Sequence, residues 1–276
     1  MEWSKLYNLL AEMFDTEACL REVEAIWEND RWFSRDKFNL TAGYVAGVME
    51  SAGLKVEMLP LKADGKTKYF DWQMPIGWDA EMAVLRYADG EVIADYRTMP
   101  CQLTMYCPST PGEVEGEVIV PEKDDPDTGK YRGKILLVSN SVSGWTAFAD
   151  EVGAIGVISD IVRLFPGVRD TREEMYDECM WMGMSSKAKC FGMHLTPRQA
   201  DELRRRMQAG PVRLRAEVKT RTYAGASYTV VGDLVGTEPE LPAVLAYGHL
   251  YEPGANDNAS GTGAILYLAK LLGEAV

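Results

Sequence analysis

Apolar residues recur every three or four positions over the first 53 residues of the chain. This period is that of an amphipathic helix, and it predicts three successive helices in this segment. The third is expected from about residue 41 to residue 52, with Gly53 as its C-terminal stop. A further helix is expected at the end of the chain, with one buried face formed by Ala264, Ile265, Leu268, Leu271 and Leu272.

Between these helical ends, short runs of alternating or continuous apolar residues predict strands. The predicted strands cover residues 54–61, 80–87, 91–96, 113–120, 134–139, 156–159, 212–219, 228–235 and 243–247. Asp89-Gly90 predicts a hairpin between the second and third of them. A helix over residues 145–152, closed by Gly153, separates two buried strands. This strand–helix–strand pattern is typical of an α/β unit.

A change in composition near residue 99 predicts a division of the chain into three segments. Prolines at positions 100, 108 and 111 mark a boundary, which predicts an N-terminal segment of residues 1–99, a middle domain of residues 100–225 and a C-terminal segment of residues 226–276. The middle domain contains a long irregular stretch, residues 163–190, and then a charged helix that begins at Pro197. The predicted fold class is α/β: a mixed sheet with helices, plus an inserted, small, β-rich α/β domain.

The 276-residue chain has a net charge of −13, which narrows the range of partners. An acidic surface repels phosphate backbones and anionic lipid, so neither nucleic acid nor membrane is an expected partner. The sequence has no apolar run long enough to span a bilayer. Its N-terminus carries charges among the apolar residues and lacks a signal-peptide cleavage site, so a cytoplasmic location is expected.

Cysteines and histidines are the residues that most often bind metals or react as nucleophiles. The five cysteines are odd in number and irregularly spaced, without a C-x-x-C pair, so we expect buried or half-buried thiols rather than a structural zinc site. The only histidines are His194 and His249. His194 precedes the charged helix of the middle domain and is interpreted as a surface or capping residue.

The loop at residues 248–261, with the sequence GHLYEPGANDNASG, carries the candidate chemistry. His249 ends a predicted strand, Asp257 begins the last predicted helix, and Pro253-Gly254 lets the chain turn back between them. An imidazole and a carboxylate suit zinc, and a carboxylate can bridge two ions. The spacing alone leaves two other interpretations open: the Asn, Asp and Ser residues are helix caps, and the histidine is a hydrogen-bonded core residue.

GANDNASG after a strand that ends in a histidine resembles the two-zinc aminopeptidases, which include bacterial leucyl aminopeptidases and glutamate carboxypeptidase II. The upstream residues VVGDLVGT look like the strand that precedes the site in this family, and GKILLVSN, a helix and GAIGVIS resemble its inserted protease-associated domain. The resemblance implies two zinc ions, with His249 binding one and Asp257 bridging both. It implies a zinc-exopeptidase sheet in the N- and C-terminal segments.

Two departures from the family pattern bear on activity. The family usually has an aspartate two residues after the histidine to orient the ring, and Tyr251 stands there, with Glu252 as the nearest replacement. The remaining ligands and the general-base glutamate of the family lie downstream of the GANDNASG helix, beyond the end of this chain. We therefore expect an incomplete site in a fragment, split-gene product or truncated chain, with weak or absent zinc binding and no peptidase activity by itself.

Two functions follow as hypotheses. The first is a zinc-dependent aminopeptidase that hydrolyses N-terminal peptide bonds with a metal-activated water, with a peptide as substrate. The alternative is a non-catalytic, peptidase-like binding protein, as the transferrin receptor of the same family exemplifies. A homo-oligomer or a complementing C-terminal fragment is the expected protein partner.

Overall fold

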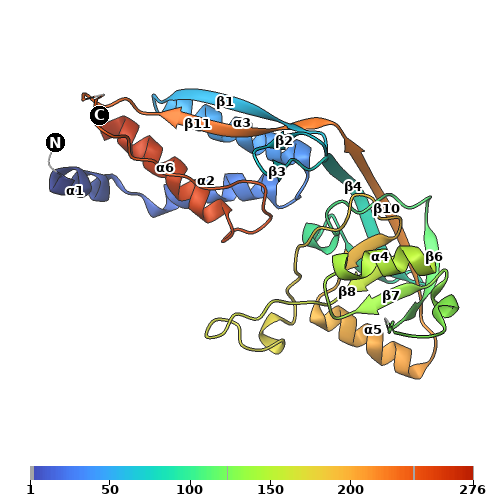
Figure 1. Ribbon diagram of the computed structural model, residues 1–276. Helices are drawn as coiled ribbons and strands as arrows, with labels where there is room; N and C mark the ends of the chain where they lie inside the picture. Colours follow the sequence, from blue (N-terminus) through green and yellow to red (C-terminus); the bar gives the residue numbers. More distant parts are fainter. Residues whose placement is uncertain (1–2, 123, 239, 276) are drawn as a thin grey trace. The chain divides into compact units, whose positions relative to one another are not determined.

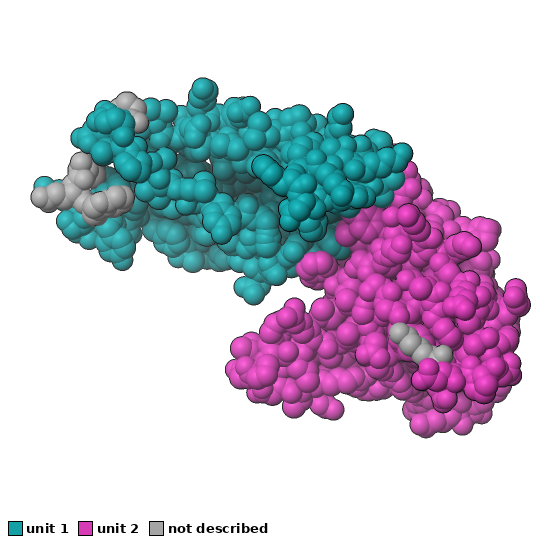
Figure 2. Space-filling view, in the orientation of Figure 1, with its two compact units in different colours: residues 1–77, 223–276 teal, residues 78–222 magenta. Residues whose placement is uncertain are grey.

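The structure, a computed structural model, describes residues 3–122, 124–238 and 240–275. The chain forms two compact units (Figure 2). Unit 1 consists of residues 1–77 and 223–276, and unit 2 consists of residues 78–222. Unit 2 is thus inserted between the two halves of unit 1, and the predicted α/β class with a mixed sheet is confirmed.

The sequence-derived boundaries differ from the limits of these units. The second predicted boundary, at residues 225/226, lies close to the return of the chain to unit 1 at Tyr223. The first, at residues 99/100, falls inside unit 2. The reason is that the predicted hairpin around Asp89-Gly90 is hydrogen-bonded into the sheet of unit 2 and so cannot belong to the preceding segment.

Among the described residues, unit 1 contains four helices and two pairs of strands (Figure 1). Its elements are α1 (Trp3–Met13), α2 (Thr16–Asp30), α3 (Arg35–Ser51), β1 (Lys55–Ala63), β2 (Lys68–Tyr69), β3 (Trp72–Gln73), β11 (Gly225–Asp233) and α6 (Ala259–Ala275). The three predicted N-terminal helices are confirmed, but α3 begins earlier than expected because the charged residues of its first turns mask the apolar period. Gly53 follows α3 in the left-handed conformation, as predicted.

The core of unit 1 joins residues from both ends of the chain. Strands β1 and β11 pair antiparallel over their whole length, with Met58 opposite Val230. Helix α3 packs on both strands, and α2 and α6 pack against α3 and each other. Ile26, Val45 and Leu266, one from each of these helices, are buried together at the centre. The three helices α2, α3 and α6 therefore share one core. The face predicted for the last helix is partly wrong, because Ala264 and Leu268 are exposed and Leu266 is buried instead.

Helix α6 lies very close to α2 at Gly263. A Cβ atom at this position would lie 2.9 Å from the backbone nitrogen of Val23, too close for any other residue. The glycine therefore allows the two helix backbones to approach, and this contact fixes the start of α6 on the N-terminal helices. None of the helices that the structure describes combines the length and apolar character that a bilayer-crossing segment needs.

Unit 2 is built on a seven-stranded mixed sheet with the order β5-β4-β10-β6-β7-β8-β9. The strands are β4 (Gly77–Tyr87), β5 (Val92–Asp95), β6 (Val114–Ile119), β7 (Ile135–Val138), β8 (Gly156–Ser159), β9 (Phe191–His194) and β10 (Arg213–Tyr223), and the helices are α4 (Ser143–Val152) and α5 (Pro197–Ala209), with short 3₁₀ turns η1 (Pro100–Gln102), η2 (Thr128–Tyr131) and η3 (Glu173–Met175). Strands β6 to β9 are parallel, and β10 pairs antiparallel with β6.

Several local predictions for unit 2 are confirmed. Strands β4 and β5 form the predicted antiparallel hairpin. Helix α4 connects the parallel strands β7 and β8 and ends at Gly153, which has a φ of 71°. Pro197 occupies the first turn of α5 behind a capping box formed by Thr196 and Gln199.

The predicted buried strand at residues 243–247 is wrong. This run is irregular, and Val244, Leu245 and Tyr247 are each more than 80% exposed. A strand needs a neighbour for its backbone hydrogen bonds, and none of the strands that the structure describes pairs with this run. A continuous apolar run indicates that a segment tends to be buried, but it does not show whether a partner strand is present.

The interpretation of His194 as a surface or capping residue is also wrong. His194 is the last residue of β9, a strand that the sequence did not reveal because glycine and histidine interrupt its short apolar run. Its side chain is fully buried, and neither ring nitrogen has a hydrogen-bond partner among the described residues. Burial lowers the pKa of His194 from 6.5 to about 4, so the imidazole is neutral at physiological pH.

The buried imidazole predicts acid sensitivity of unit 2. The folded-state pKa lies below the unfolded value, so the unfolded chain binds the proton more tightly, and stability falls as pH drops from 6.5 towards 4. The difference is worth up to about 3 kcal/mol. We expect urea denaturation curves of His194→Phe to lose much of the pH dependence that the unchanged protein shows between pH 7 and pH 4.5. Equal pH slopes for the two proteins would contradict this assignment.

Candidate metal centre

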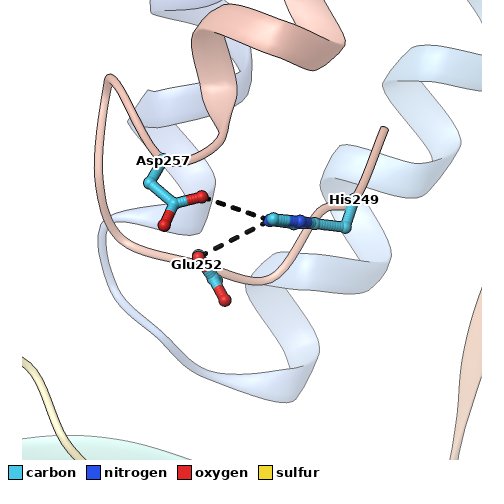
Figure 3. Close-up of side chains that lie close together, drawn as sticks. All are labelled: His249, Glu252 and Asp257. Atoms are coloured by element: carbon cyan, nitrogen blue, oxygen red, sulfur yellow. Dashed lines mark ion pairs between the residues drawn. The ribbon is translucent and has the colours of Figure 1, made fainter. Parts of the chain in front are cut away.

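Three side chains converge in the loop that precedes α6 (Figure 3). His249 Nε2 lies 3.3 Å from Asp257 Oδ1 and 3.6 Å from Glu252 Oε2. One donor atom from each of the three residues lies within 4.8 Å of the other two. The loop thus brings an imidazole and two carboxylates to one point, although the residues are separated by up to eight positions in the sequence.

The two carboxylates of this group oppose each other electrostatically. Glu252 Oε2 is buried and has no hydrogen-bond partner among the described residues. Burial and the neighbouring Asp257 carboxylate raise the pKa of Glu252. A cation between the three side chains would satisfy the buried oxygen and neutralise the repulsion.

The start of α6 holds the backbone on both sides of this group. The carbonyl oxygen of His249 accepts hydrogen bonds from Thr262 Oγ1 at 3.0 Å and from Asn258 Nδ2 at 3.3 Å. At the other side, the chain turns tightly at Gly254, where a Cβ atom would lie 2.6 Å from the carbonyl oxygen of Asp257. Asn258, one of the predicted capping residues, therefore braces the loop beside the His249 and Asp257 pair through its side-chain amide.

Tyr251 takes no part in the group of three. Its ring lies under the guanidinium of Arg35, 4.3 Å from the ring centroid, and packs against Phe33 and Phe38. Its backbone has a φ of 74°, which is uncommon for a residue with a side chain. The position that carries an orienting carboxylate in the two-zinc family pattern is thus used here to attach the loop to α3 and to the residues before it.

Asp30, at the end of α2, fixes the same stretch of the loop. Its buried carboxylate accepts a hydrogen bond from the Tyr251 amide at 2.9 Å and another from Thr41 Oγ1 at 2.5 Å. Burial raises the pKa of Asp30 to about 6, and the two hydrogen bonds oppose this rise. Burying an acid costs free energy unless it is hydrogen-bonded. The bonds to Tyr251 and Thr41 offset this cost, so Asp30 is well placed to attach the loop to the end of α2.

The sequence predictions for this site are met unevenly. The structure brings His249 and Asp257 together as expected. Both belong to unit 1, whereas His194 belongs to unit 2. Glu252, considered from sequence only as a substitute for an orienting carboxylate, contacts His249 and is a third candidate donor. The spacing of three residues between His249 and Glu252 is only a weak sequence signal for a metal site. The turn at Gly254 has to be known before Glu252 can be placed beside Asp257.

The donor set fits zinc. One imidazole nitrogen and two carboxylate oxygens are ligand types that zinc prefers, and catalytic zinc sites use three protein ligands with a fourth position open to water. His249, Glu252 and Asp257 would hold the ion. The side chains of His249 and Asp257 are 52% and 68% exposed, which leaves access for solvent.

Solved structures of peptidases share this fold. A zinc aminopeptidase from Bacillus subtilis, BSAP, has a TM-score of 0.58 and 18% identity over 94% of this chain and 58% of its own. An aminopeptidase from Aneurinibacillus sp. strain AM-1 has a TM-score of 0.50 and 17% identity over 96% and 61%. A peptidase M28 precursor from Shewanella amazonensis has a TM-score of 0.51 and 13% identity over 82% and 52%. The fold is therefore zinc aminopeptidase-like.

Two facts limit the conclusions about function that this structural similarity supports. The chain spans only 52–61% of the length of these three proteins. No protein-family model matches the sequence, and the search of curated proteins found no match. The likeness at this level of identity establishes the fold, while the chemistry has to be argued from the residues of the loop.

The attachment of the loop by Asp30 can be tested directly. In Asp30→Ala the Tyr251 amide and the Thr41 hydroxyl lose their buried acceptor, so we expect unit 1 to lose about 1–3 kcal/mol of stability. Hydrogen exchange of the Tyr251 amide, measured by NMR or mass spectrometry, should accelerate more than exchange in α3. Asp71→Ala, which removes an exposed carboxylate from unit 1, is the matched control. Unchanged exchange at Tyr251 in Asp30→Ala would contradict the role of this bond.

Proposed function

We propose that this chain carries a portion of the active centre of a zinc-dependent aminopeptidase. The observation that supports the proposal is the convergence of His249, Glu252 and Asp257 in the loop before α6 of an aminopeptidase-like fold. The reaction class is hydrolysis of an N-terminal peptide bond, and the substrate is a peptide. The non-catalytic alternative gains no support, because the solved structures with this fold are named as peptidases.

The residues of the loop have distinct tasks in this proposal. His249 binds the metal through Nε2, the atom that faces both carboxylates. Asp257 has two oxygens and a largely exposed side chain, so it can bind one ion and reach towards a second. Glu252 contributes a buried oxygen whose negative charge is costly without a cation. A bound zinc ion would polarise the scissile carbonyl and lower the pKa of a water molecule.

The proposal also covers the identity of unit 2. Its β7–α4–β8 connection supports the resemblance to a protease-associated domain that the sequence suggests. Unit 2 lies in the chain between Gly77 and Tyr223, so it interrupts the sequence of the aminopeptidase-like unit as an inserted domain would. We propose that unit 2 is this inserted domain, with boundaries at residues 78 and 222.

Zinc binding tests the metal site without reference to activity. Three donors, two of them mostly exposed, leave much of the coordination shell to water, so we expect the chain alone to bind zinc more weakly than about 1 μM. Isothermal titration calorimetry with zinc chloride should show this weak binding, and His249→Ala should weaken it further by roughly tenfold or more. Glu57→Gln, an exposed carboxylate on β1, should leave it unchanged.

Two results of this titration would count against specific elements of the proposal. Stoichiometric binding well below about 1 μM would contradict the expectation of a weak site. Equal affinity of the unchanged protein and of His249→Ala would show that zinc binds elsewhere, and the proposed metal centre would then be wrong.

A hydrolysis assay addresses the chemical step. The group contains no further carboxylate or imidazole among the residues that the structure describes, so no side chain is left to act as general base once all three bind metal. We therefore expect this chain, with zinc present, to release no 4-nitroaniline from leucine 4-nitroanilide above the background rate. A turnover of about 1 s⁻¹ that disappears in His249→Ala would contradict this expectation and would show that the three side chains suffice.

A further inference from the structure

Cys101 and Cys179 lie side by side in unit 2, although they are 78 positions apart in the chain. Cys101 belongs to the 3₁₀ turn η1, and Cys179 belongs to the irregular stretch between β8 and β9. The Cys179 Sγ atom lies 3.8 Å from the carbonyl oxygen of Cys101, so the two residues are in contact. Both residues are half-buried and both are reduced.

Neighbouring contacts hold the two segments in this arrangement. The Met105 amide donates to the carbonyl oxygen of Met182, at 2.9 Å, just beyond the two cysteines. On the other side of Cys179, Asp177 accepts two hydrogen bonds from the guanidinium of Arg198, at 2.6 and 2.7 Å. The thiols are therefore kept together by bonds on both sides of Cys179, and their proximity does not depend on the cysteines alone.

We propose that Cys101 and Cys179 are a redox-responsive thiol pair that forms a disulfide when the protein meets a peroxide. The Cys101 thiolate attacks one peroxide oxygen, the O–O bond breaks, and the leaving hydroxide is protonated to water. Cys179 then attacks the resulting sulfenic sulfur, the S–S bond forms, and the second oxygen leaves as water with the Cys179 proton. The two sulfur atoms together give two electrons to hydrogen peroxide.

The environment of the pair explains the order of these steps. The neighbouring Cys179 thiol lowers the pKa of Cys101, whereas the neighbouring Cys101 and burial raise the pKa of Cys179. The more readily ionised thiol is the nucleophile, and the protonated neighbour is placed to resolve the sulfenic acid. Cys107 and Cys190 differ because burial raises the pKa of both thiols, that of Cys107 to about 12.

The disulfide would restrain the irregular stretch. In the reduced protein this stretch is attached by polar contacts, such as those of Arg172 with Asp160 and Asp201, and by the buried side chains of Met175 and Met184. A covalent link from Cys179 to η1 would close a loop of most of unit 2 and remove conformations from its unfolded state. Oxidation is therefore expected to raise the melting temperature of unit 2 by roughly 5–10 °C.

The experiment oxidises the reduced 276-residue chain with equimolar hydrogen peroxide, unfolds it in urea, blocks remaining thiols with N-ethylmaleimide, and identifies peptides by mass spectrometry without reduction. We expect a peptide pair linked through Cys101 and Cys179, together with alkylated Cys19, Cys107 and Cys190. Cys101→Ser and Cys179→Ser should each lose the linked pair and the rise in melting temperature. Cys19→Ser, a half-buried thiol of unit 1, is the matched control and should keep both.

Circular dichroism of both serine variants confirms that the loss of the link is not a loss of folding. Recovery of Cys101 and Cys179 as two separately alkylated or separately oxidised peptides would overturn the proposal. A link between either residue and another cysteine, or equal melting temperatures of the oxidised and reduced proteins, would overturn it as well.

Discussion

The antiparallel pairing of β1 with β11 is the contact on which the organisation of this chain depends. It joins Lys55–Ala63 to Gly225–Asp233, with unit 2 contained in the chain between them. Closing such a long loop costs conformational entropy, and the pairing alone cannot offset it because a two-stranded sheet is marginal in water. The buried helices α2, α3 and α6 supply the remaining stabilisation. The apolar faces at both ends of the sequence are therefore halves of one core.

This shared core also decides where the candidate metal centre forms. Helix α6 is fixed on α2 by the close approach at Gly263, and the loop before it is fixed to the end of α2 by Asp30. Between these two attachments the loop turns His249, Glu252 and Asp257 towards each other. The candidate metal ligands come from the C-terminal end of the chain, but the N-terminal helices set their geometry.

Most elements of unit 2 and all described helices of unit 1 could be predicted from the sequence, because each follows a local signal. The period of the apolar residues, the glycine at the end of α4 and the proline at the start of α5 act within one or two turns of chain. The run at residues 243–247 and His194 were misjudged for the opposite reason. Whether an apolar run becomes a strand, and whether a histidine is buried, depends on partners far away in the sequence.

The effect of Tyr251, which stands where the two-zinc pattern has an orienting carboxylate, also depends on residues far away in the sequence. Within the loop alone, the change removes a partner for the His249 ring, and the sequence pattern therefore indicates a weakened site. The structure shows what takes its place: the His249 carbonyl is held by Thr262 and Asn258, and the Tyr251 ring is held by Arg35. These contacts fix the backbone on each side of the imidazole and leave its ring to be oriented by Glu252 and Asp257. Because the imidazole is flanked by two carboxylates that repel each other, a cation bound between the three side chains would stabilise this arrangement.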